Sequence, residues 1–248
     1  MQEVARSAPD GYTIGQANSG MVVTPLIQPG VGSFDMERDY TPLTMFSVGP
    51  LVLFVNARVP ANDVAAFIAY AKTKPEGLNY SSTGLGGAGH LSVELLSRLT
   101  GTKFLPIPCK GNAPAVVAVI AGEVDFLVSM VSDAALQSVQ NKRLKMLGVT
   151  TRNATPIVPG VPPIGATVPG FEVPIWVALL GPHGLPAEVV AALNRAFGTI
   201  LNEPETRRRF EGYGLVPTAS TPAAVTEAIQ KEMKTWAPVV RERNIRVN

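Results

Sequence analysis

Apolar positions change their spacing repeatedly along the chain, and each change predicts a switch between strand and helix. Residues 50–56 form one continuous apolar run of strand length, which is typical of a buried strand in a parallel sheet. Residues 64–72 then carry apolar side chains at helical spacing, and Asn62 or Asp63 is placed to cap this helix. A strand–helix alternation therefore begins at residue 50.

The alternation continues to residue 149 and resumes after residue 174. Strands are expected at residues 78–82, 104–108, 124–128, 144–149 and 175–180. Helices are expected at residues 91–99, 113–121, 134–139, 186–201, 205–210 and 222–236. Strands that alternate with helices imply parallel sheets with helices on both faces, so the predicted fold class is α/β.

The remaining segments suggest how the chain is divided. Residues 17–38 are rich in Gly, Pro and Ser and are expected to be loop with one helical turn, after a short strand at 12–14. We interpret the proline-rich residues 152–174 and the stretch 56–60 as two crossings between two lobes. The expected lobes are residues 1–56 with 175–248, and residues 57–174, with a ligand cleft between them.

Composition narrows the function classes. The chain has 248 residues with a net charge of +2 and no dense basic run, which argues against a nucleic-acid partner. No stretch of 18 apolar residues occurs, so no direct membrane insertion is expected. One cysteine and two histidines are too few for a disulfide, a CxxC motif or a zinc site. No G-x-S-x-G motif or other catalytic set is evident, so we expect no catalytic residues, no metal and no cofactor.

Residues 84–89, GLGGAG, match G-x-G-x-x-G between a predicted strand and a predicted helix. A dinucleotide site also needs an acidic residue about 20 positions further on, and none occurs between Glu94 and Glu123. An NAD(P)-dependent oxidoreductase is therefore an alternative supported by half of its motif. A P-loop is excluded because His90 stands at the lysine position.

The same loop also has a simpler chemical interpretation. Glycines before a helix allow backbone N–H groups to converge on an anion such as a carboxylate. The hydroxyls of Ser81, Ser82 and Thr83 could add donors. A plain strand-to-helix turn, with glycines needed only for packing, remains the structural alternative.

Four segments carry a resemblance to a known family: residues 8–13 (APDGYT), 80–90 (YSSTGLGGAGH), 108–115 (PCKGNAPA) and 175–186. They resemble the Bug family, the extracytoplasmic solute receptors of tripartite tricarboxylate transporters. The resemblance implies a two-lobed type II periplasmic binding protein fold that closes on a mono-, di- or tricarboxylate. It also implies a periplasmic location and membrane permease subunits as partners.

The resemblance and the glycine loop together suggest a set of ligand-binding residues. These are Asn18, Ser19, Ser81, Ser82, Thr83, Gly84, Gly86, Gly87, His90, Lys110 and Trp176. Three of them have a second interpretation. His90 could merely close the loop, Lys110 could be solvated, and Trp176 could belong to a hinge core.

Three departures from the family pattern stand out. The family usually carries Ser where Gly87 stands, and Tyr where Cys109 stands. The family also begins with a strand, a Gly-rich loop, a helix and a second strand, and this chain begins after them. We therefore expect a first lobe that lacks its N-terminal βαβ unit, and no signal peptide in this chain. A further alternative is a fragment that folds but binds nothing, and whose first lobe exposes a sheet edge and apolar surface and self-associates.

Overall fold

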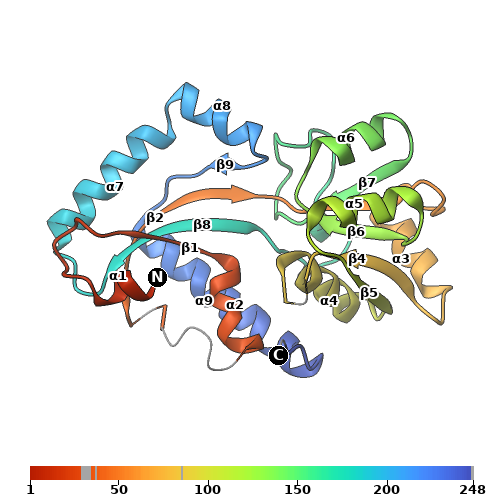
Figure 1. The fold of residues 1–248 in the computed structure, drawn as a ribbon, viewed down its shortest axis with the longest axis horizontal. Coiled ribbons are helices and arrows are strands. Elements are labelled where there is room, and N and C mark those ends of the chain that lie inside the picture. The colour runs from red at the N-terminus through yellow and green to blue at the C-terminus, as the bar shows by residue number, and fades with distance from the viewer. Residues whose placement is uncertain (29–34, 37, 85, 247–248) are drawn as a thin grey trace. The chain divides into compact units, whose positions relative to one another are not determined.

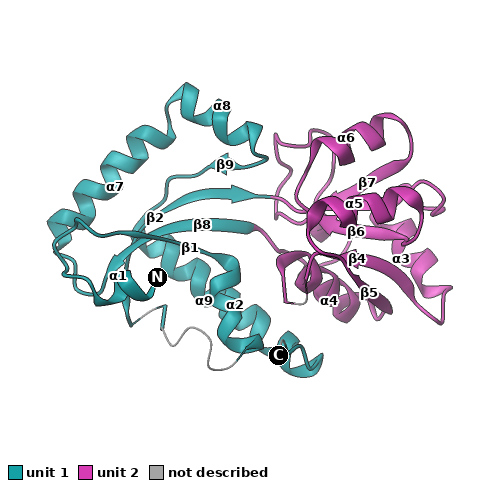
Figure 2. Cartoon of the chain, in the orientation of Figure 1, with its two compact units in different colours: residues 1–49, 175–248 teal, residues 50–174 magenta. Residues whose placement is uncertain are grey.

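The computed structural model describes residues 1–28, 35–36, 38–84 and 86–246. The chain forms two compact units: residues 1–49 with 175–248 make unit 1, and residues 50–174 make unit 2 (Figure 2). The predicted boundary at residue 56 lies too late, because residues 52–56 pair inside the sheet of unit 2. The proline-rich residues 152–174 also belong to unit 2, where Val161, Ile164 and Phe171 are buried.

Unit 2 is built on a five-stranded sheet with the order β5-β4-β6-β3-β7. Its strands are β3 (Val52–Asn56), β4 (Leu78–Ser82), β5 (Phe104–Pro108), β6 (Phe126–Ser129) and β7 (Leu144–Val149). β4 pairs in parallel with β5 and β6, whereas β3 pairs antiparallel with β6 and β7. The expectation of parallel sheets is thus correct for three strands of unit 2 and wrong for β3. All five β3 residues are buried because the strand is internal to the sheet and covered on both faces.

Helices cover both faces of this sheet (Figure 1). They are α3 (Val64–Lys72), α4 (Ala88–Thr100), α5 (Asn112–Ala121) and α6 (Asp133–Gln140). Phe67 of α3 lies against Phe104 and Phe126, with ring centroids 5.9 and 5.1 Å apart. Leu127, the next residue of β6, joins the cluster of α5 and α6 on the other face, because neighbouring strand residues point to opposite faces.

The edge strand β5 carries two prolines, Pro106 and Pro108. The N–H of Cys109 donates to the carbonyl of Ser82 at 2.8 Å. In a parallel ladder alternate residues turn to the same side, so the backbone nitrogens of Pro106 and Pro108 point away from β4. Proline has no N–H, and both prolines therefore occupy edge positions where a donor would lack a strand partner.

Unit 1 has an antiparallel sheet with the order β1-β8-β2-β9. Its strands are β1 (Gly15–Asn18), β2 (Tyr40–Gly49), β8 (Ile175–Pro182) and β9 (Val216–Pro217). Its helices are α1 (Gln2–Arg6), α2 (Ser19–Ile27), α7 (Ala187–Leu201), α8 (Pro204–Gly212) and α9 (Pro222–Glu242). The expectation of parallel sheets is wrong here, because hydrophobic spacing reveals a strand but not its direction. A short 3-10 turn, Ile164–Ala166, completes the regular elements of the described chain in unit 2.

The core of unit 1 lies on both faces of β8 and β2. Tyr40, Trp176 and Val225 belong to a buried cluster with residues of α1, α2 and α9. Leu43 and Leu179 pack on the opposite face against α7. No helix in the described ranges is both long enough and apolar enough to cross a bilayer.

The N-terminal prediction was partly wrong. The strand lies at Gly15–Asn18 instead of residues 12–14, and the expected loop contains the nine-residue helix α2. This helix forms despite Pro25, with the side chain of Asn18 accepting a hydrogen bond from the N–H of Met21 at 3.1 Å. Residues 29–34 and 37 of the expected loop lie outside the described residues.

Candidate ligand-binding site

Three helices of unit 2 start at one edge of its sheet, the edge formed by the carboxyl ends of its parallel strands. β4, β5 and β6 run parallel, and each is followed along the chain by α4, α5 and α6 respectively. The carboxyl ends of parallel neighbours share an edge, so the N-termini of these helices lie there too. The hydrogen bond between Cys109 and Ser82 ties the first two strand–helix junctions together.

Two of these three N-termini have no side-chain cap. The N-cap residues of α4 and α5 are Gly87 and Gly111, and neither helix has a capping side-chain hydrogen bond. α6 differs, because the hydroxyl of Ser132 accepts from the N–H of Ala135 at 3.4 Å. Helix N-termini carry unpaired N–H groups and partial positive charge. The first turns of α4 and α5 are thus suited to an anion.

The glycine loop owes two of its glycines to backbone geometry. Gly86 has a φ of 78°, a left-handed conformation that favours glycine. A Cβ on Gly89 would lie 2.3 Å from the carbonyl oxygen of Val128, so glycine lets α4 approach β6. Two of the three glycines of the G-x-G-x-x-G motif are thus explained by the fold alone, without a dinucleotide. Leu85, within the loop, lies outside the described residues.

The three predicted hydroxyl donors have different environments. The hydroxyl of Ser81 is buried and donates to the carbonyl of Ala115 at 2.9 Å. The hydroxyl of Ser82 donates to the Gly84 carbonyl at 3.1 Å and accepts from the Gly84 N–H at 3.3 Å. Ser82 thus holds the β4–α4 junction, and Ser81 ties the end of β4 to α5. Thr83 is exposed and is the hydroxyl of the three that a ligand could reach.

His90 closes the loop from inside. Its side chain is 6% exposed, and its Nδ1 accepts a hydrogen bond from the N–H of Gly86 at 3.3 Å. Its Nε2 lies 3.9 Å from Oε1 of Glu94. Burial lowers the pKa of His90, and the Glu94 carboxylate partly opposes this shift. These contacts match the second interpretation of His90, as the residue that closes the loop.

The β5–α5 junction adds one predicted and one unpredicted residue. Lys110 is exposed there, where its charge could attract an anion over a distance. The side-chain oxygen of Asn112 is buried and has no hydrogen-bond partner among the described residues. The sequence interpretation missed Asn112. The sequence feature that could have identified Asn112 is Gly111, which lies between a strand and a helix as the glycines of residues 84–89 do.

The other predicted residues belong to unit 1. The side chain of Asn18 caps α2, and Ser19, the first residue of that helix, is 8% exposed. The indole N–H of Trp176 donates to Glu232 at 3.0 Å, and the indole N–H of Trp236 donates to the same carboxylate. Trp176 is therefore a core residue of unit 1, which supports its second interpretation.

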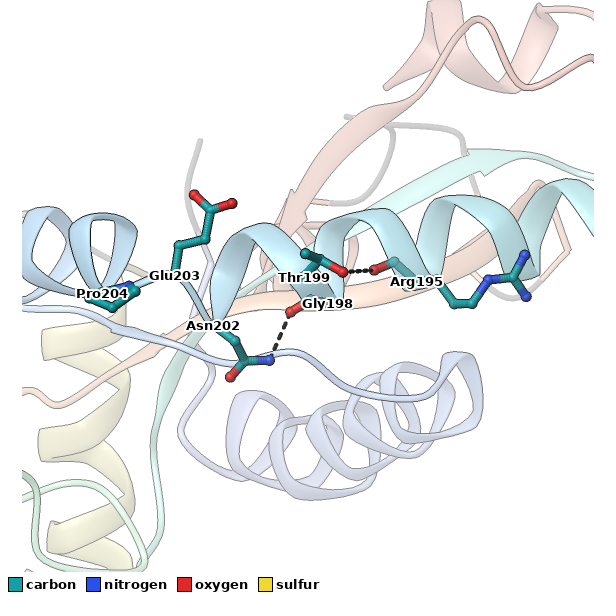
Figure 3. A pocket seen from close by; sticks show the side chains of 6 residues that line it. All are labelled: Arg195, Gly198, Thr199, Asn202, Glu203 and Pro204. Atoms are coloured by element: carbon teal, nitrogen blue, oxygen red, sulfur yellow. Dashed lines mark hydrogen bonds between the residues drawn. The ribbon is translucent and has the colours of Figure 1, made fainter.

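An open hollow on unit 1 lies where α7 ends and α8 begins (Figure 3). Thr199 and Asn202 line it and donate to helix carbonyls of Arg195 and Gly198 at 3.1 and 2.7 Å. The C-terminal end of a helix carries partial negative charge, and Glu203 lies beside it. Because its lining combines Arg195 with Glu203 and a helix C-terminus, the charge of this hollow does not single out a carboxylate. Across the described residues, no three His, Cys, Asp or Glu side chains gather in a metal-binding arrangement.

Two α/β units are the architecture of periplasmic binding proteins, and solved structures of that class share the fold of this chain. The chain belongs to the tripartite tricarboxylate transporter receptor family (TctC), which it matches over residues 1–245. This is a family of solute receptors, and both the Bug-family resemblance and the predicted fold class are confirmed.

Individual relatives support this membership. BugT from Bordetella pertussis is 29% identical over 241 residues, which cover 96% of this chain and 73% of BugT. The structure of R. palustris Rpa4515 with adipate is 28% identical with a TM-score of 0.77, covering 98% of this chain and 82% of that one. MatC (Rpa3494) from Rhodopseudomonas palustris with bound malate is 27% identical with a TM-score of 0.72, covering 96% and 82%.

Proposed function

We propose that this protein is a periplasmic receptor that captures a small carboxylate for a tripartite tricarboxylate transporter and passes it to the permease subunits. The observation that carries the proposal is the pair of helices α4 and α5. Both begin after a glycine, have no side-chain cap, and place their N-termini at one edge of the sheet of unit 2. The relatives with bound adipate and malate support a carboxylate as the ligand class.

In this proposal the backbone does most of the binding. The first N–H groups of α4 and α5 bind the carboxylate oxygens, and Thr83 adds a hydroxyl at the loop. Lys110 raises the local concentration of anions without a fixed contact. Unit 2 carries ten Lys and Arg residues against seven Asp and Glu residues, a balance that favours the approach of an anion.

Thermal unfolding in the presence of carboxylates tests the proposal directly. A ligand at 100 times its Kd stabilises the folded state by about 2.7 kcal/mol, which produces a measurable rise in Tm. The panel contains acetate, malate, adipate and citrate, so that it spans one to three carboxylates. Failure of every carboxylate to raise the Tm would contradict the proposal. Saturable NADH binding in a fluorescence titration would support the dinucleotide alternative.

The Gly86→Val variant tests the role of the loop. A β-branched residue strains a backbone at φ 78° and disturbs the loop, so we expect carboxylate binding to be lost. Gly160→Val is the matched control, because Gly160 has a φ of 82° in the same unit and open space around it. Both variants carry backbone strain, but only Gly86→Val should lose the ligand-induced rise in Tm. Equal ligand responses in the two variants would exclude this role.

A further inference from the structure

His90 contacts the glycine loop in a way that depends on its protonation state. Its Nδ1 accepts the N–H of Gly86 at 3.3 Å, so a lone pair on Nδ1 is required. The single proton of the neutral ring is then on Nε2, the nitrogen that lies 3.9 Å from Oε1 of Glu94. A second proton would have to bind Nδ1, where it would face the N–H of Gly86.

Few titratable groups surround this imidazole. Glu94, one turn further along α4, faces Nε2, and Tyr80 of β4 lies with its ring centroid 6.5 Å away. The strands β5 and β6, which also contact α4, contribute no titratable side chain. Burial lowers the pKa of His90 and Glu94 opposes the shift. The neutral ring is thus the form that the site favours at neutral pH.

We propose that His90 is a positioning residue that holds the glycine loop in its carboxylate-binding form only while its imidazole is neutral, so that acidification releases the ligand. The inference rests on the proposed function and deepens it, because it adds regulation of the ligand affinity of the same site by pH. Protonation converts Nδ1 from an acceptor to a donor, and two donors then oppose each other at Gly86. The left-handed Gly86 loses the contact that fixes it to the helix behind it.

The direction of the pH dependence separates this role from direct contact with the ligand. If His90 touched a carboxylate, its protonation would place a cation beside an anion, and affinity would rise as the pH falls. If His90 acts through Gly86, affinity falls as the pH drops through the lowered pKa of His90. The decrease approaches at most about tenfold per pH unit, because a single proton is linked to binding.

The first experiment examines the ring without any ligand. The chain contains two histidines, so the His183→Asn variant leaves one imidazole for nitrogen-15 NMR. We expect the Nε2-protonated tautomer at neutral pH, with titration displaced below the ordinary histidine range. A tautomer protonated at Nδ1 would overturn the inference by itself.

The second experiment measures the affinity for malate and for adipate between pH 7.5 and 4.5, so that the range extends well below the ordinary pKa of histidine. His90→Asn keeps an acceptor near the Nδ1 position but cannot titrate in this range, so the affinity of each variant is compared with its own value at pH 7.5. The unchanged chain and His183→Asn should lose affinity on acidification more steeply than His90→Asn, since protonation of the ligand affects all three alike.

The outcomes distinguish the inference from the proposed function. Affinity that rises on acidification, or an identical pH profile for His90→Asn, overturns the inference and leaves carboxylate binding intact. Absence of malate and adipate binding at every pH, with no other carboxylate of the panel bound, overturns the proposed function and the release step with it. The NMR result in that case still decides whether His90 accepts from Gly86.

Discussion

Both units contain helices without a side-chain cap, but they place the N-termini of these helices differently. In unit 1 the side chains of Asn18 and Thr221 cap α2 and α9, whereas α1, α7 and α8 have no side-chain cap and do not follow parallel strands. In unit 2 the N-termini of α4 and α5 follow glycines and have no side-chain cap. Unit 1 carries eleven basic and twelve acidic residues, whereas unit 2 carries ten and seven. Unit 2 is thus the unit whose helix ends and charge both favour an anion.

Strand direction explains why only one unit has this arrangement. Consecutive antiparallel strands end at opposite edges, so the helices that follow them do not start together. The parallel strands β4, β5 and β6 end at one edge and place three helix N-termini there. Parallel pairing therefore brings the backbone N–H donors of several helix N-termini together in unit 2. The antiparallel pairing in unit 1 does not bring helix N-termini together in this way.

The largest expected effect contrasts a helical glycine from each unit. Gly89→Ala places a Cβ 2.3 Å from the Val128 carbonyl oxygen, so α4 must move away from β6. We expect a loss of about 3 kcal/mol in the free energy of unfolding. Gly198→Ala in α7 meets no atom within 4 Å and should stabilise the chain by about 0.5–1 kcal/mol. Urea unfolding measures both; a tolerated Gly89→Ala would refute the close-approach explanation.

The next effect is confined to unit 1. Glu232→Leu removes the carboxylate that accepts from Trp176 and Trp236, leaving two buried indole N–H groups without this acceptor. Each such loss costs about 1–3 kcal/mol, but the variant also no longer buries a carboxylate, so we expect a net loss of about 2 kcal/mol. Fluorescence should change strongly, because these are the two tryptophans of the chain. Carboxylate affinity, assigned to unit 2, should change little at temperatures where the variant is folded. A large loss of affinity would contradict the assignment of carboxylate binding to unit 2, because it would show that the core of unit 1 also determines the affinity.

The smallest effect concerns a single hydroxyl at the proposed site. Thr83→Val removes an exposed donor without changing the shape of the side chain, so affinity should fall by about 1 kcal/mol or several-fold. Thr167→Val is the control, an exposed threonine elsewhere in unit 2. Calorimetric titration with adipate and malate compares them. Equal affinities of Thr83→Val and Thr167→Val would show that Thr83 takes no part in binding, so that the proposed site would consist of backbone donors only.

Local features of the fold could be predicted from the sequence. Helix α3 and strand β4 have the predicted bounds because each combines clear apolar spacing with an end signal, such as Asp63 before α3. Strand β2 was not predicted, since Pro42, Gly49 and its polar residues mask the strand pattern. The direction of β3 depends on how distant segments pair, which hydrophobic spacing does not record.

The candidate site shows the same limit. The glycine loop and its position before a helix were predicted, because both are local. The use of the Ser81 hydroxyl was not, since its acceptor, Ala115, lies 34 residues away. Trp176 likewise donates to a carboxylate 56 residues away. Sequence spacing suggested donors for the candidate site, which stay a prediction, and the folded chain shows that the hydroxyl of Ser81 and the indole N–H of Trp176 already have acceptors.

The two prolines of β5 have a consequence beyond the fold of one molecule. An exposed strand edge normally offers backbone donors to a neighbouring copy, and this is how aggregates extend a sheet from molecule to molecule. Pro106 and Pro108 remove the N–H groups at two of the three outward-facing positions of this strand, and Phe104 keeps the third. Even when copies are crowded together, the β5 edge is therefore a poor template for growth of an intermolecular sheet.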